Sequence, residues 1–113
     1  MQHATPLLIG LGNRLRSDDG AGIRLAEALE AQASGLEVVI CHQLTPDLAE
    51  PISQASAVLF VDAWAVDQRQ PRLMPLRASA SGDPSGHALT PGGLLALSAA
   101  LYGACPPAWQ LLI

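Results

Sequence analysis

The chain has 113 residues, a mass of 11.7 kDa and a formal net charge of −4. This is the size of one domain, so we expect a single domain spanning residues 1–113. Half of the residues are hydrophobic and 14% are charged, against about 25% in an average domain, which excludes a disordered chain. The six cations are all arginines and form no cluster, which argues against a nucleic-acid partner.

The sequence contains no segment typical of membrane insertion or export. The early apolar run at residues 7–11 is far shorter than the roughly 18 residues that a membrane span needs, and no basic segment with a cleavage site precedes it. We therefore expect a cytoplasmic protein without a membrane partner. Cys41 and Cys105 match neither a disulfide framework nor a zinc motif, and we expect two buried free thiols.

Predicted strands and helices alternate along the chain. Strong or weaker apolar patterns predict strands at residues 7–11, 36–41, 57–62 and 72–77 and from residue 109 onwards. Amphipathic spacing predicts a helix over residues 23–33. A short helix follows Thr45 and is limited by Pro51, and a last helix begins at Thr90-Pro91 and ends at Gly103. This order predicts an α/β three-layer sandwich, with a twisted, mostly parallel sheet of about five strands between helices.

The first loop after a predicted strand carries glycines and carboxylates. Ligands of parallel sheets bind beyond the carboxyl ends of the strands, and Gly10 and Gly12 allow the backbone to approach a ligand closely. Asp18 and Asp19 precede the helix, where a helix N-cap is the alternative role. A dinucleotide fingerprint is disfavoured, because Leu15 replaces its third glycine and two carboxylates would repel a pyrophosphate.

Two further polar residues are candidates for a site. Asp62 ends the most apolar predicted strand, where simple strand termination is an equally good explanation. His87 lies in a loop before the last helix, where an ordinary surface histidine is the alternative. Two carboxylates and one imidazole together suit a divalent transition metal with open coordination positions. The fold rule brings the first loop and Asp62 to one edge, but no pattern places His87 beside them.

Three motifs occur in chain order: Gly10, Gly12, Asn13, Asp18, Asp19 and Gly22, then Val61-Asp62-Ala63, then His87 with Leu89-Thr90-Pro91. Over essentially the whole chain, this pattern resembles the [NiFe]-hydrogenase maturation proteases. The resemblance implies an endopeptidase that removes the C-terminal extension of a hydrogenase large-subunit precursor after nickel insertion. That precursor is the expected partner.

The resemblance also implies roles for individual residues. Asp19, Asp62 and His87 are the implied catalytic residues and contact nickel that the substrate supplies, so we expect no permanent cofactor. Most family members have glutamate where this chain has Asp19. The implied substrate-binding residues are Gly10, Gly12, Asn13, Asp18 and His42. The segment His42-Gln43-Leu44 resembles the branch that serves cytosolic bidirectional hydrogenases; a partly buried loop histidine is the alternative for His42.

The chain ends at Ile113 inside an apolar run, whereas members of the family usually continue into a further helix. We therefore expect a domain that lacks the family's C-terminal end, with self-association through the uncovered surface or impaired activity. The alternative function is a non-catalytic paralogue that binds the nickel-loaded large subunit without cleaving it. A nucleotide-binding α/β domain is a weaker third hypothesis.

Overall fold

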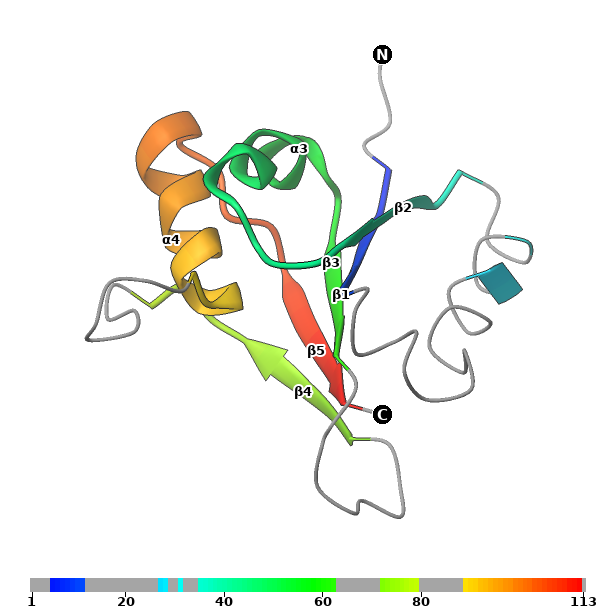
Figure 1. The fold of residues 1–113 in the computed structure, drawn as a ribbon. Coiled ribbons are helices and arrows are strands. Elements are labelled where there is room, and N and C mark those ends of the chain that lie inside the picture. The colour runs from blue at the N-terminus through cyan, green and yellow to red at the C-terminus, as the bar shows by residue number, and fades with distance from the viewer. Residues whose placement is uncertain are drawn as a thin grey trace.

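A computed structural model describes residues 5–11, 27–28, 31, 35–62, 72–79 and 89–112. Figure 1 shows its strands and helices. The strands are β1 (Leu7–Leu11), β2 (Glu37–Cys41), β3 (Val58–Asp62), β4 (Arg72–Leu76) and β5 (Ala108–Leu112). The helices are the 3-10 helix η1 (Pro46–Leu48), α3 (Ala49–Gln54) and α4 (Pro91–Tyr102). Within these ranges no helix has the length and apolar character needed to cross a membrane.

The strands form one sheet in the order β2-β1-β3-β5-β4. Strands β1, β2, β3 and β5 are parallel, and β4 pairs antiparallel with β5 at the edge of the sheet. The expected mostly parallel α/β architecture is confirmed. Strands β4 and β5 form where the sequence pattern predicts strands. In the sheet, β5 lies between β3 and β4, so β4 is the outermost strand on that side.

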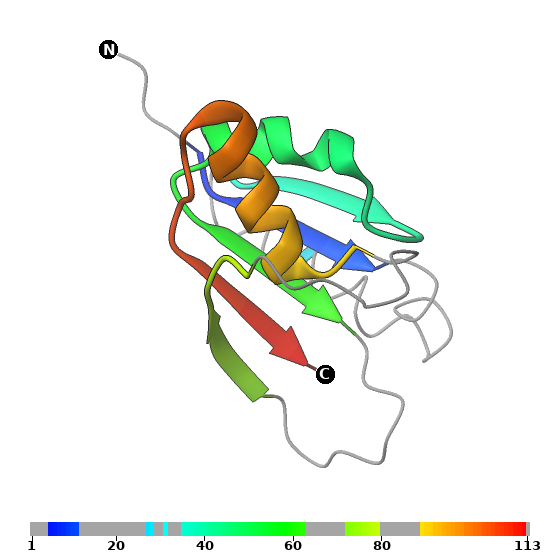
Figure 2. The ribbon, with the colours of Figure 1, turned by 90° about the vertical axis from the view of Figure 1, so that its left-hand side faces the viewer.

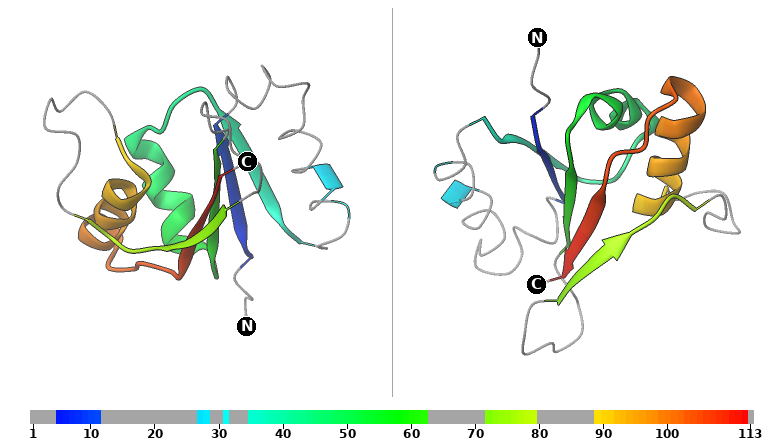
Figure 3. Two further views of the ribbon diagram at one scale, coloured as in Figure 1. Left: turned by 90° about the horizontal axis from the view of Figure 1, so that it is seen from below. Right: turned by 180° about the vertical axis from the view of Figure 1, so that it is seen from behind.

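The helices lie on both faces of the sheet. Figures 1 and 3 show α3 and α4 together on one face, and the helical residues 27–28 and 31 on the opposite face. These three residues fall inside the helix predicted for 23–33, the rest of which lies outside the described residues. The arrangement gives the three layers expected from alternating strands and helices.

The main core lies between the sheet and the two helices α3 and α4. Alternate residues of the strands point toward these helices, because successive side chains of a strand face opposite sides. On this face Leu7, Ile9 and Phe60 pack with Ile52 of α3 and Leu94 of α4, all buried. The opposite face has a smaller cluster around Leu8 and Val61, as expected for central strands covered on both sides.

The ends of the helices follow the predicted residues. Thr90 is the N-cap of α4, and its Oγ1 accepts a hydrogen bond from the Gly93 N–H at 3.0 Å. Gly103 closes α4 with a φ of 72°, a left-handed conformation that glycine adopts at little cost. Thr45 precedes η1 without a side-chain capping hydrogen bond. Pro51 falls in the first turn of α3, where backbone N–H groups have no partner within the helix.

The two cysteines differ in exposure. Cys41 is half-buried at the end of β2, whereas Cys105 is exposed. The expectation of two buried thiols is therefore wrong for Cys105. This residue belongs to the connection between α4 and β5.

Candidate active site at the carboxyl edge of the sheet

The parallel strands end together at one edge, called here the carboxyl edge. Each strand contributes one residue to it, in the spatial order Cys41, Leu11, Asp62, Leu112 and Arg72. Strand β4 is antiparallel, so it contributes its first residue, whereas the other strands contribute their last. Ligands of open parallel sheets bind beyond this edge, which makes it the candidate site.

Asp62 is the carboxylate that the sheet itself supplies to the carboxyl edge. Strand β3 carries it directly after the buried Val61, and its register partner on β5 is Leu112. The residue is half-buried, and its Oδ1 atom is buried. A role of Asp62 in a site stays a prediction, and its position is one at which open parallel sheets bind ligands.

Cys41 lies at the same edge, two strands away from Asp62. Burial, and in second place the negative charge of Asp47, raise the pKa of the Cys41 thiol above its usual value. The thiol therefore stays protonated near neutral pH. Because the thiolate is the reactive form, Cys41 is poorly suited to act as a nucleophile.

His42 follows Cys41 and is exposed. The alternative of a partly buried loop histidine is therefore wrong. His42 comes directly after β2 and Asp62 ends β3, and β1 lies between these two strands. The contact of His42 with a substrate stays a prediction.

Of the other predicted site residues, the structure describes Gly10. Gly10 is buried within β1, in register with Ile40 and Val61. The remaining ones, Gly12, Asn13, Asp18, Asp19 and His87, lie outside the described residues. Among the residues that are described, no group of three histidine, cysteine or acidic side chains is placed to hold a metal ion.

Two of the undescribed segments are joined to described residues near the carboxyl edge. The segment that contains Asp19 begins directly after Leu11, the last residue of β1. Figure 2 shows that α4 runs opposite to the parallel strands, so it begins toward the edge at which they end. The segment that contains His87 rejoins the described chain at Leu89, just before this helix.

Arg72 is an edge residue that the sequence analysis did not single out. Its position depends on the antiparallel direction of β4, which brings the start of this strand to the ends of the others. The sequence signal that could have found it is the turn predicted at residues 67–71 between two predicted strands, since a short connection without a helix favours antiparallel strands.

The comparisons with known proteins give one structural match and no sequence match. No protein-family profile and no curated protein matches the sequence. Among solved structures, the chain is similar to the hydrogenase maturating endopeptidase HybD from E. coli, with a TM-score of 0.61 and 18% sequence identity. The match covers 96% of this chain and 73% of the HybD chain. At this identity the likeness establishes a shared fold.

Proposed function

We propose that this protein is an endopeptidase that removes the C-terminal extension of a [NiFe]-hydrogenase large-subunit precursor after nickel insertion. The observation that carries the proposal is Asp62, a half-buried carboxylate at the carboxyl edge. It ends a central strand in a chain whose fold is similar to that of HybD over 96% of its length. The three sequence motifs that resemble the maturation proteases support the same function.

In this proposal Asp19, Asp62 and His87 contact the nickel ion that arrives with the substrate. Carboxylate oxygens and an imidazole nitrogen are suitable ligands for a divalent transition metal that keeps open coordination positions. Since the ion belongs to the precursor, the protein needs no resident metal. Nickel insertion then becomes the condition for cleavage, because a precursor without nickel lacks the group that these residues recognise.

Hydrolysis of a peptide bond requires an activated water molecule and a proton acceptor. The nickel of the substrate can polarise the scissile carbonyl or lower the pKa of a bound water. An aspartate at the carboxyl edge can accept the proton, and Asp62 is the described candidate. The raised pKa of Cys41 argues against the alternative in which a thiolate attacks the peptide bond.

The remaining predicted residues would bind the substrate around this centre. Gly10 lies near the end of β1, Gly12, Asn13 and Asp18 come after this strand in the sequence, and His42 follows β2. The exposure of His42 supports its contact with the precursor. The segment His42-Gln43-Leu44 favours a client among the cytosolic bidirectional hydrogenases, and a cytoplasmic location agrees with that client.

The experiment that tests the proposal incubates the purified protein with nickel-loaded and nickel-free large-subunit precursor. Mass spectrometry of the products then detects the loss of a C-terminal peptide. We expect this loss with the wild-type protein and nickel-loaded precursor alone. Asp62→Asn removes the charge at nearly constant shape and is expected to abolish cleavage while the circular dichroism spectrum stays unchanged.

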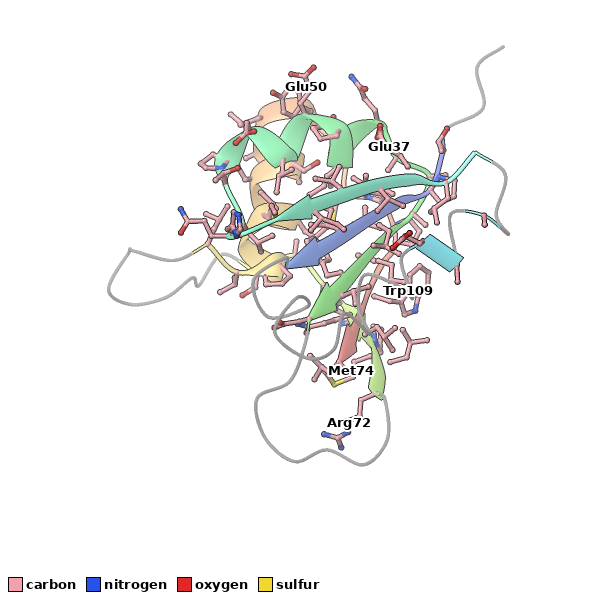
Figure 4. The ribbon with its side chains drawn as sticks, turned by 45° about the vertical axis from the view of Figure 1, so that its right-hand side comes forward. Glu37, Glu50, Arg72, Met74 and Trp109 are labelled. Atoms are coloured by element: carbon pink, nitrogen blue, oxygen red, sulfur yellow. The ribbon has the colours of Figure 1, made fainter. Side chains whose placement is uncertain are left out.

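Glu37→Gln is the matched control. Glu37 is an exposed carboxylate at the first position of β2, where the parallel strands begin, and so it lies far from the carboxyl edge (Figure 4). Its neutralisation should leave cleavage intact. Binding of the precursor without any loss of mass would favour the non-catalytic paralogue over the protease. Equal cleavage of both precursors would contradict the role of nickel.

A further inference from the structure

Arg72 and Asp62 occupy equivalent positions on two strands of the sheet. Leu112 of β5 is the register partner of Asp62 on one side and of Arg72 on the other. Register partners in neighbouring strands project from the same face of a sheet. Arg72 and Asp62 therefore lie on one face of the carboxyl edge, with the buried side chain of Leu112 between them.

The Arg72 side chain is a solvent-exposed cation. Within the described ranges no ion pair or side-chain hydrogen bond joins it to another residue. Figure 4 shows its guanidinium group standing clear of the strands, next to Met74. Arg77, the other described cation, follows the opposite end of β4. Arg72 is thus the described positive charge at the carboxyl edge of a protein with a net charge of −4.

The spacing between Arg72 and Asp62 suits an extended peptide. Two inter-strand spacings separate their backbones, or about 10 Å. An extended chain advances about 3.3 Å per residue, so a peptide crossing the strand ends from Asp62 would bring its third residue to Arg72. The planar guanidinium group binds a carboxylate through two parallel hydrogen bonds, which a lysine cannot do.

We propose that Arg72 binds an acidic side chain, or the terminal carboxylate, of the peptide extension about three residues beyond the scissile bond. This inference rests on the proposed protease function. The extension is the part of the precursor that is free to lie extended across β5 toward β4, because the retained part belongs to a folded subunit. Arg72 then selects and positions the substrate, while the residues around Asp62 act on the bond.

The test uses nickel-loaded precursors that carry Asp, Asn or Lys at the third residue after the scissile bond. Wild-type protein is expected to cleave the Asp precursor roughly tenfold more efficiently than the Lys precursor, through a lower KM. Arg72→Ala should remove this preference with kcat nearly unchanged, and Arg72→Glu should reverse it in favour of Lys. Arg72→Lys should restore part of it.

Arg77→Ala is the control, since it removes an exposed arginine from the far end of the same strand and should keep the wild-type preference. Cleavage by the wild type with equal preference for Asp and Lys, or an unchanged preference in Arg72→Ala, would overturn the role of Arg72 and leave the protease function standing. Absence of cleavage of all precursors by the wild type would overturn the protease function, and the inference with it.

Discussion

The backbone N–H of Ser79 donates a hydrogen bond of 3.0 Å to the carbonyl oxygen of Gly92. This bond joins the segment after β4 to the first turn of α4, and so it holds together the two described ends of segment 80–88, which contains His87. The absence of a side chain at Gly92 permits the contact. An added Cβ would lie 3.1 Å from the Arg77 carbonyl oxygen and 3.1 Å from Ser79 Cβ.

Gly92→Ala should therefore disturb the segment that carries His87 more than the core. Segment 77–79 lies at the surface and must give by a few tenths of an ångström, so we expect a change of about 1 kcal/mol or less in the free energy of unfolding. Precursor cleavage should fall several-fold. Gly103→Ala, at the other end of α4, should cost about 1 kcal/mol through its positive φ but leave cleavage by the folded protein unchanged. Equal activity losses in the two variants would contradict this role of Gly92.

The N-cap of α4 provides a stability prediction. Thr90→Ala removes the hydroxyl that accepts the hydrogen bond from Gly93 and should lower the free energy of unfolding by about 1 kcal/mol, as measured by urea denaturation. Thr90→Ser keeps the hydroxyl and should retain most of this free energy of unfolding. Thr45→Ala is the matched comparison, because Thr45 precedes η1 without a capping hydrogen bond, and its loss should be clearly smaller. Similar losses at both threonines would rule out the capping bond as the cause.

Local patterns predicted the fold well where they reflect burial and backbone chemistry. The apolar run that ends at Asp62 and the Thr90-Pro91 start of α4 both have causes within a few residues of the chain. The edge residue Arg72 and the contact of Ser79 with Gly92 have no such local cause. They depend on which strands become neighbours and in which direction β4 runs, and these are properties of the whole sheet.

Some residues of the candidate site can be predicted from the sequence and the fold rule, whereas others cannot. Asp62 follows from the rule that ligands bind beyond strand ends, and the structure places it at the carboxyl edge. A motif, and not the fold, predicts a role for His87, and its place relative to Asp62 stays a prediction. The exposure of His42 depends on how the chain turns after β2, and the local sequence His42-Gln43-Leu44 does not determine this turn.

The pKa of Cys41 predicts a slow reaction with thiol reagents. Burial and the charge of Asp47 raise this pKa, so alkylation by iodoacetamide near pH 8 should be slower at Cys41 than at the exposed Cys105. Peptide mass spectrometry separates the two sites. Asp47→Asn removes the smaller of the two causes and should move the pH profile of Cys41 alkylation downward; an unmoved profile would contradict the electrostatic contribution.

The same shift has a consequence for stability. A raised pKa in the folded state means that the folded protein holds the thiol proton more tightly than the unfolded chain. The resulting contribution is fully present below the ordinary thiol pKa and is lost as the pH rises through the folded value. Replacement of Cys41 by Ala should reduce the decline of the thermal midpoint at alkaline pH. Cys105→Ala serves as the control.

The face of β4 and β5 opposite to α3 and α4 predicts self-association. Leu73 is 62% exposed and Trp109 is 38% exposed on this face, and Figure 4 shows Trp109 on the side away from α3. Exposed apolar neighbours of this kind favour contacts between molecules. Light scattering should therefore show concentration-dependent mass for the wild type and less for Leu73→Lys. Leu101→Lys, at a comparably exposed leucine of α4, should have no such effect; a strictly monomeric wild type would refute the prediction.

The strand order constrains the moment at which the molecule can fold during synthesis. Strand β5 leaves the ribosome after β4, yet it pairs with both β3 and β4. Until it emerges, β4 has no partner among the described strands, and one side of β3 offers unpaired backbone groups to other chains. The Asp62 end of β3 therefore acquires its neighbour Leu112 only after β5 has emerged, and a nascent chain stalled before that point would present an open sheet without a complete site.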